Sequence, residues 1–170
     1  MSYTEHGLKH ADFVSQRALE IAEVMGLSKH TQDLSMTASL CHDMGNFLSR
    51  TYHHYYGSLL FFDIFKGQID IKDLTVLMQA IANHDKEDMK LVRPVSAITI
   101  IADKSDVRRE RVLEKNIQKI KEDIHDRVNY AVNDNDLSIN QKTKEINLKL
   151  TIDTTWVDPL DYFQIFEIFL

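Results

Sequence analysis

The stretch SLCHDMGN, residues 39–46, places a histidine and an aspartate side by side at the end of an apolar segment with helical spacing. Burying two such polar groups without partners costs several kcal/mol. They must therefore be paired, bound to a ligand, or less buried than the pattern indicates. The rest of the chain has to supply the partners of His42 and Asp43, and the search for them determines the predicted fold.

The composition of the 170-residue chain is typical of a compact, mostly helical protein, with 44% hydrophobic and 27% charged residues, five glycines and two prolines. This length fits one domain, so we expect a single domain over residues 1–170. The net charge of −6 argues against a nucleic-acid partner, because affinity for phosphates usually requires a basic surface.

Other features of the chain predict a cytoplasmic protein that does not engage a membrane. Cys41 is the only cysteine, which excludes an internal disulfide and fits a reducing compartment. The start MSYTEHGLKH lacks a basic segment followed by an apolar run, so no signal peptide is expected. The longest apolar runs are too short to span a bilayer.

Hydrophobic periodicity predicts a bundle of about five to six helices. Gly26 is expected to stop the first helix, and Pro94 can open the fifth as its first residue. The predicted helices cover residues 8–25, 29–43, 52–66 and 71–84, and the fifth runs from 94 and continues with a bend into the charged stretch 107–125.

Near residue 127 the period changes from helical to alternating. Val128, Tyr130 and Val132 would share one face of a first strand, and the alternation resumes over 137–139 and 146–152. This pattern predicts a small C-terminal antiparallel β-meander. Asp158 as a cap, followed by Pro159, then predicts an aromatic-rich closing helix.

Four residues at the edges of apolar helical faces are the candidate partners in a buried site. They are His10, His42, Asp43 and Asp103. Two imidazoles and two carboxylates that meet in a helical bundle suit a divalent transition metal, with positions left open for water. The alternative is a buried hydrogen-bond network without a metal.

Three further histidines, His53, His54 and His84, extend this set. A carboxylate has two oxygens, so Asp43 could bridge two metals, the second held by His84 and one of the other two histidines. Two ions about 3.5 to 4 Å apart can clamp the attacking and leaving oxygens of a phosphoryl displacement. The expected cofactors are therefore one or two divalent transition-metal ions, drawn from Fe, Mn, Co, Ni and Zn.

The order of these residues resembles the HD-domain superfamily of metal-dependent phosphohydrolases. The resemblance includes HADFVSQRA around His10, CHDMG around Asp43 and IADKSD around Asp103. It covers about residues 5–110, which would form the metal-binding helical core, while about 107–170 would form a C-terminal helix, the β-meander and the closing helix. The implied fold class is mainly α, an HD-domain helical bundle.

The resemblance also assigns roles to single positions. It implies that the first metal is held by His10, His42, Asp43 and Asp103, and that His53 and His84 hold the second. His53 fits better than His54 because Gly57 stands four residues after it.

Two departures from the family pattern concern the substrate. Asn46 stands where members that cleave nucleoside monophosphates carry a glutamate, and HDKEDMKLVRP, residues 84–94, lacks the glycine-tyrosine-proline signature of members that cleave cyclic dinucleotides. The ten residues from Asp43 to His53 are also a shorter spacing than in many two-metal members.

The expected function is that of a phosphohydrolase that uses a metal-activated water on a nucleotide or similar small phosphoester. Asp43 and Lys104 are the catalytic candidates, and Lys104, Arg108 and Arg109 could hold the substrate phosphate. A solvated charged face is the alternative interpretation of this basic run.

Two other functions fit the same residues. One is an HD-type di-iron oxygenase, and the other is a non-catalytic module that senses a nucleotide. Cys41 is interpreted as a small buried hydrophobe rather than a nucleophile. The aromatic C-terminal helix suits either the core or the contact of a homodimer.

Overall fold

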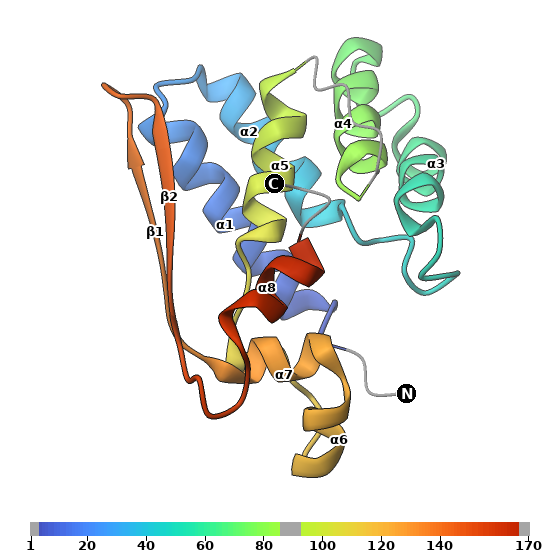
Figure 1. Cartoon of the computed structure of the whole chain (residues 1–170). Helices are drawn as coiled ribbons and strands as arrows, with labels where there is room; N and C mark the ends of the chain where they lie inside the picture. Colours follow the sequence, from blue (N-terminus) through green and yellow to red (C-terminus); the bar gives the residue numbers. More distant parts are fainter. Residues whose placement is uncertain (1–3, 86–92, 167–170) are drawn as a thin grey trace. The chain divides into compact units, whose positions relative to one another are not determined.

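The computed structural model describes residues 4–85 and 93–166 of the chain. The fold is mainly helical, with a small antiparallel sheet and a closing C-terminal helix, as predicted (Figure 1). Most of the polar segment HDKEDMK and the last residues predicted for the closing helix, 167–170, lie outside the described residues. Within the described residues, no helix has both the length and the hydrophobicity needed to cross a lipid bilayer.

The chain divides into two compact units. Residues 7–103 form the N-terminal unit, and residues 1–6 together with 104–170 form the C-terminal unit. The expectation of a single domain stays a prediction.

The described part of the N-terminal unit holds five helices, and at least two of them begin at side-chain caps. The side chain of Ser28 accepts a hydrogen bond from the backbone N–H of Thr31, and that of Asp70 accepts one from Lys72. These caps fix where the second and fourth helices start. The helices are α1 (Leu8–Val24), α2 (Lys29–Cys41), α3 (His53–Phe65), α4 (Ile71–Asn83) and α5 (Pro94–Lys104).

The core of this unit lies between α2, α3 and α4. Helix α4 contributes Leu74, Leu77 and Ile81, which follow one another at helical spacing and are at most 2% exposed. Phe61 of α3 and Ala38 of α2 pack against them and are fully buried. Each large apolar side chain buried in this way contributes about 1.5 to 3 kcal/mol.

The C-terminal unit consists of short elements around a second core. Val107, Val128 and Val157 lie at its centre. In chain order the elements are a short 3₁₀ helix η1 (Arg109–Arg111), α6 (Ile117–Glu122), α7 (Ile124–Ala131), β1 (Val132–Asn140), β2 (Glu145–Ile152) and α8 (Pro159–Phe166).

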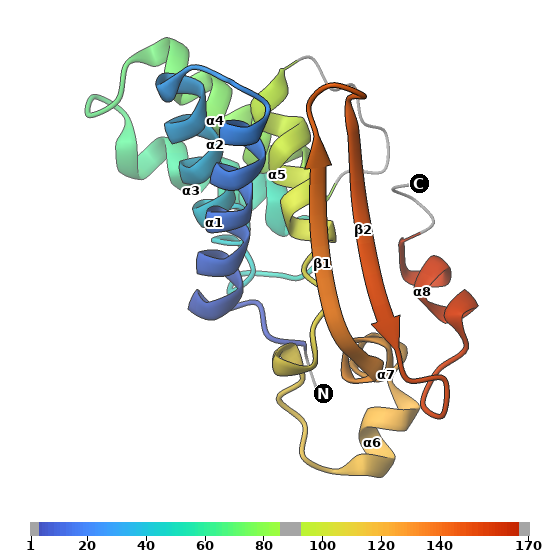
Figure 2. The same cartoon turned by 90° about the vertical axis from the view of Figure 1, so that its left-hand side faces the viewer.

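The sheet is a two-stranded hairpin (Figure 2). Burial alternates along much of both strands, as expected. Leu137 pairs with Leu148, and Ile139 pairs with Ile146. These residues share a face because side chains of a strand alternate with period two.

Two predictions about this unit are wrong. The strand expected over 128–132 is helical up to Ala131, because Ile124, Val128 and Ala131 share a helical face that packs into the core of the unit. Asp123 caps that helix by accepting from the N–H groups of residues 125 and 126. Of the residues 128–132, only Val132 is in a strand.

The fifth helix does not continue into 107–125 either. It ends at Lys104, and Arg108 has an extended backbone, with φ −148° and ψ 147°. The stretch 107–125 holds η1 and α6 instead, and α6 begins at the Asn116 cap.

Candidate metal centre

The six predicted ligand residues meet inside the N-terminal unit. His10 lies in the first turns of α1, His53 is the first residue of α3, and Asp103 lies at the end of α5. His42 and His84 directly follow the last residues of α2 and α4, and Asp43 comes next to His42. The helices therefore bring together residues that lie up to 93 positions apart. All four histidines are at most 3% exposed.

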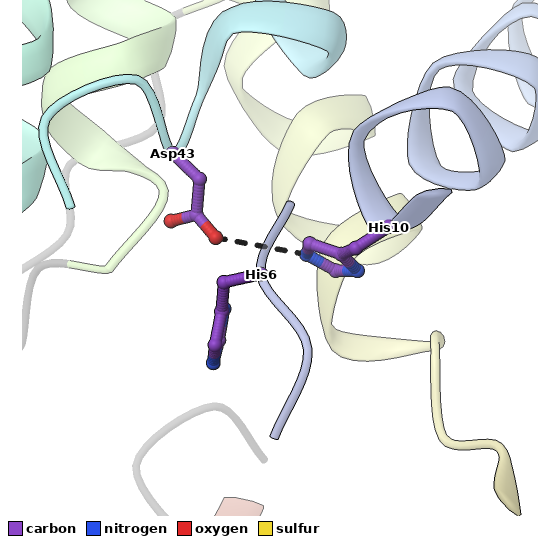
Figure 3. A group of neighbouring side chains, drawn as sticks. All are labelled: His6, His10 and Asp43. Atoms are coloured by element: carbon purple, nitrogen blue, oxygen red, sulfur yellow. Dashed lines mark ion pairs between the residues drawn. The ribbon is translucent and has the colours of Figure 1, made fainter. Parts of the chain in front are cut away.

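The first set of donor atoms comes from four residues. The Nε2 atoms of His10 and His42 lie 3.2 Å apart, and Oδ1 of Asp103 is 3.2 Å from the first and 3.5 Å from the second. Oδ2 of Asp43 lies 3.8 Å from His10 Nε2 and 3.6 Å from His42 Nε2. Figure 3 shows His10 on α1 and Asp43 on the turn after α2, with their ion pair dashed. Donors of a tetrahedral ion with bonds of about 2.1 Å lie about 3.4 Å apart, so these spacings suit one metal.

A second set is built on the other oxygen of Asp43. Its Oδ1 lies 3.0 Å from Nε2 of His53 and 3.5 Å from Nε2 of His84. The two Nε2 atoms are 3.0 Å from each other. Asp43 thus directs one carboxylate oxygen at each set of donors, and its role as a bridge between two metals stays a prediction.

Three of the imidazoles are oriented by the same kind of local hydrogen bond. The Nδ1 atoms of His42, His53 and His84 donate to the carbonyl three residues earlier, at 2.7, 2.8 and 2.7 Å. With the proton on Nδ1, the lone pair of Nε2 faces the cluster. Such a fixed tautomer is typical of histidines that bind metals. These carbonyls, at Ser39, Arg50 and Ile81, were not identified from the sequence.

The pKa values of His42 and His53 reflect the nearby carboxylates. Burial lowers the pKa of His42, but Asp43 and Asp103 outweigh it and raise this pKa to about 9. Burial also lowers the pKa of His53, but the hydrogen bond and the charge of Asp43 outweigh it and raise this pKa. The pKa of His84 is lowered by burial and by the nearby His42. The two carboxylates therefore favour a cation at the centre of the cluster.

A close backbone contact holds the turn after α2 against α3. A Cβ atom on Gly45 would lie 2.1 Å from the carbonyl oxygen of His53 and 2.5 Å from the amide nitrogen of Gly57. Only glycine can occupy position 45 without moving one of the two segments. This contact brings the turn that carries Asp43 against the start of α3, where His53 lies.

Other polar residues surround the six. His54 is buried, and its ring centroid lies 6.2 Å from that of His84, while His53 makes the direct contact with Asp43. Oδ2 of Asp85 is 3.9 Å from Nδ1 of His53. Both amide atoms of Asn46 are buried and lack a hydrogen-bond partner among the described residues. No role was assigned to Asn46 from the sequence, and the structure shows its side-chain amide as a buried polar group beside the cluster.

The buried histidines and aspartates form groups that could hold a metal ion. His10, His42 and Asp103 form one such group, and His42, Asp43 and His84 form another. A further group joins His53 and His54 to Asp85.

The basic candidates belong to the C-terminal unit. Nε and Nη2 of Arg108 donate to the carboxylate of Asp106. Nε of Arg109 donates to the carbonyl of Tyr130 at 2.7 Å, and its guanidinium lies over the ring of that residue. Lys104 follows Asp103 directly and is half-buried. The roles of Lys104, Arg108 and Arg109 at the site stay predictions.

Cys41 packs against the core of the N-terminal unit. Burial raises the pKa of its thiol, which disfavours the reactive thiolate. This agrees with its interpretation as a small hydrophobe.

Comparisons with models of protein families, with curated proteins and with solved structures found no match to this chain.

Proposed function

We propose that the chain is a metal-dependent phosphohydrolase of the HD type, which acts on a nucleotide or similar small phosphoester. One observation carries the proposal. The two carboxylate oxygens of Asp43 divide the donor atoms into two sets, one with His10, His42 and Asp103 and one with His53 and His84. In each set the donors are spaced as the ligands of one divalent ion would be.

The donor chemistry fits transition-metal ions. Imidazole nitrogens with carboxylate oxygens suit Fe, Mn, Co, Ni or Zn better than Mg or Ca, which prefer oxygen ligands alone. Bound there, such ions would lower the pKa of a coordinated water and stabilise negative charge on phosphoryl oxygens.

The chain's own residues have three tasks in this reaction. Asp43 and Asp103 supply the negative charge that retains cations, as the raised pKa of His42 indicates. The i−3 carbonyls hold the histidine rings in place. The second set has three donor atoms and the first has four, so the side of His53 and His84 leaves more room for a phosphate oxygen.

The substrate's phosphate needs cationic partners. Lys104 is the first candidate, because it follows a proposed ligand on the same helix. Arg108 and Arg109 already donate within the C-terminal unit, and each would have to exchange a partner to bind phosphate. We expect a small phosphorylated molecule of the cytoplasm rather than a nucleic acid.

The first experiment is elemental analysis of purified protein, in metal ions per chain. We expect two ions in the wild type, one in His84→Ala and none in Asp43→Ala. His125→Ala is the matched control, because His125 is exposed and lies on α7, and it should retain the wild-type content. A panel of phosphoesters should then show turnover that Asp43→Ala abolishes.

Other outcomes would contradict the proposal in distinct ways. Two irons per chain with oxygen uptake and no phosphoester hydrolysis would indicate the oxygenase. Tight nucleotide binding without turnover would indicate the sensing module. Protein that takes up no metal even after reconstitution would leave a hydrogen-bonded cluster without metal chemistry.

A further inference from the structure

A pocket of about 490 Å³ lies in the N-terminal unit, at the ends of α2, α4 and α5 where these helices begin. Its volume falls within the range of about 300 to 1,000 Å³ that small-molecule sites occupy. Residues from the first turns of all three helices line it, among them Thr31, Lys72 and Val95.

The walls of the pocket are largely apolar. Leu34, Val76, Pro94 and Val95 contribute them. Val76 is 8% exposed and Val95 is 3% exposed, so both are anchored in the core. Such walls suit the aromatic or aliphatic body of a ligand, which would gain free energy by leaving water.

The charged groups at this pocket leave two cations available. Among the described residues, neither the ammonium of Lys72 nor the guanidinium of Arg93 makes a hydrogen bond or an ion pair, and both side chains are exposed. The acidic Asp73 is engaged by His30, with 2.9 Å between its Oδ1 and Nε2 of the imidazole. The rim is therefore positive on a chain whose net charge is −6.

The capped starts of α2 and α4 are not the binding groups. Ser28 already accepts from the backbone N–H of Thr31, and Asp70 accepts from that of Lys72. An anion would therefore be held by the side chains of Lys72 and Arg93. Arginine offers a planar fork of donors to phosphate, sulfonate or carboxylate, and lysine offers a point charge.

We propose that this pocket binds a small organic anion, an apolar body that carries one phosphate, sulfonate or carboxylate group. The same three helices carry His42, His84 and Asp103 at or next to their other ends. At 1.5 Å per residue, Thr31 and His42 lie roughly 16 Å apart along α2. The ligand is thus separate from any molecule bound at the His/Asp cluster, and the proposal does not depend on the function of that cluster.

The test is a titration of isotope-labelled, full-length protein with naphthalene-1-sulfonate, followed by backbone amide NMR shifts. We expect saturable shifts at Leu34, Val76 and Val95. The double substitution Lys72→Ala/Arg93→Ala should weaken binding at least about tenfold, because charge-assisted hydrogen bonds contribute about 1.5 to 3 kcal/mol. Both side chains are exposed, so the fold should tolerate their removal.

Two controls define failure. The double variant Lys66→Ala/Lys142→Ala removes the same charge from exposed positions outside the pocket and should bind the probe as the wild type does. The neutral 1-naphthalenemethanol should bind more weakly than the sulfonate. The proposal is overturned if the pocket amides do not shift at millimolar probe, if the shifts gather at His84 and Asp103 instead, or if the Lys72/Arg93 variant binds unchanged.

Discussion

Buried aspartates in the two units meet different partners. In the C-terminal unit Asp106 is 1% exposed, and its carboxylate contacts the guanidinium groups of Arg108 and Arg111. In the N-terminal unit the side chains of Asp43 and Asp103 are at most 10% exposed, and both contact histidines.

This difference separates a structural ion pair from a site. Arginine is always protonated, so the network of Asp106 carries its own compensating charge. Histidine gains a positive charge only by taking up a proton, so its contacts with Asp43 and Asp103 are ion pairs only while it is protonated, and a metal ion would take the place of that proton. The C-terminal unit also holds a third case, Asp126, which is buried and has Thr4 as its side-chain partner.

The largest expected effect follows from breaking the internal pair. Asp106→Asn should lower the free energy of unfolding by about 3–5 kcal/mol, because Arg111 would keep a buried charge without compensation. Urea denaturation at neutral pH measures it. Asp136→Asn, at an exposed position of β1, should change stability by no more than about 0.5 kcal/mol. Equal stability of both variants would show that the arginines do not depend on Asp106.

The second effect concerns the contact that supports the N-terminal cluster. Gly45→Ala should cost about 1–3 kcal/mol of stability and reduce the metal content, because the added Cβ forces the turn away from His53. Gly67→Ala is the comparison: its φ of +83° strains alanine, but nothing lies within 4 Å of the new atom. It should therefore destabilise the fold without changing metal content. Normal metal content in Gly45→Ala would contradict this account.

The third effect concerns metal binding at the His/Asp cluster of the N-terminal unit. Saturating Mn²⁺ or Zn²⁺ at 100 times Kd should stabilise the wild type by about 2.7 kcal/mol for each bound ion in denaturant titrations. Asp43→Asn should lose this gain. Without metal, Asp43→Asn should lose some stability at neutral pH, because Asp43 raises the pKa values of the buried His42 and His53 and so pairs with their protonated forms. Metal that stabilises Asp43→Asn as much as the wild type would contradict this account.

The smallest effect concerns Asp126. Burial and the nearby Asp123 raise the pKa of its carboxyl group, so the folded state holds the proton to a higher pH than the unfolded state does. The contribution of Asp126 to stability is therefore largest at acidic pH and falls as the pH rises through the unfolded and then the folded pKa. Asp126→Asn should gain stability relative to the wild type as the pH rises above about 4, the ordinary pKa of an aspartate. A constant difference across this range would show that the pKa is not raised.

Much of the site was predictable because its ligands occupy helix ends. Gly26, Ser28, Asp70 and Pro94 mark the boundaries of the helices in the N-terminal unit, and the structure has them close to the predicted positions. His10, Asp43 and Asp103 were expected to meet because each is a polar group at an apolar helical face, and the structure brings them together. Sequence patterns do not encode the contact of Gly45 with α3, because it joins two backbone segments through space.

The C-terminal unit was predicted less well for a physical reason. Val128, Tyr130 and Val132 alternate as a strand would, but Ile124, Val128 and Ala131 also satisfy a helical period. Short segments carry both patterns, and tertiary packing decides between them. Here the Asp123 cap and the core around Val128 favour the helix.

The contact between Glu5 and Arg111 has a kinetic consequence. The backbone N–H of Glu5 donates to the carbonyl of Arg111 at 2.7 Å, and Nε and Nη2 of Arg111 donate back to the carbonyl of Glu5 at 3.2 and 3.0 Å. In chain topology, the N-terminal unit is an insertion within the C-terminal unit. Contacts between residues so far apart in the sequence form slowly, because the chain loses the entropy of closing the long loop before the contact adds any stability. During synthesis, more than a hundred residues are added after Glu5 before its partner Arg111 is made.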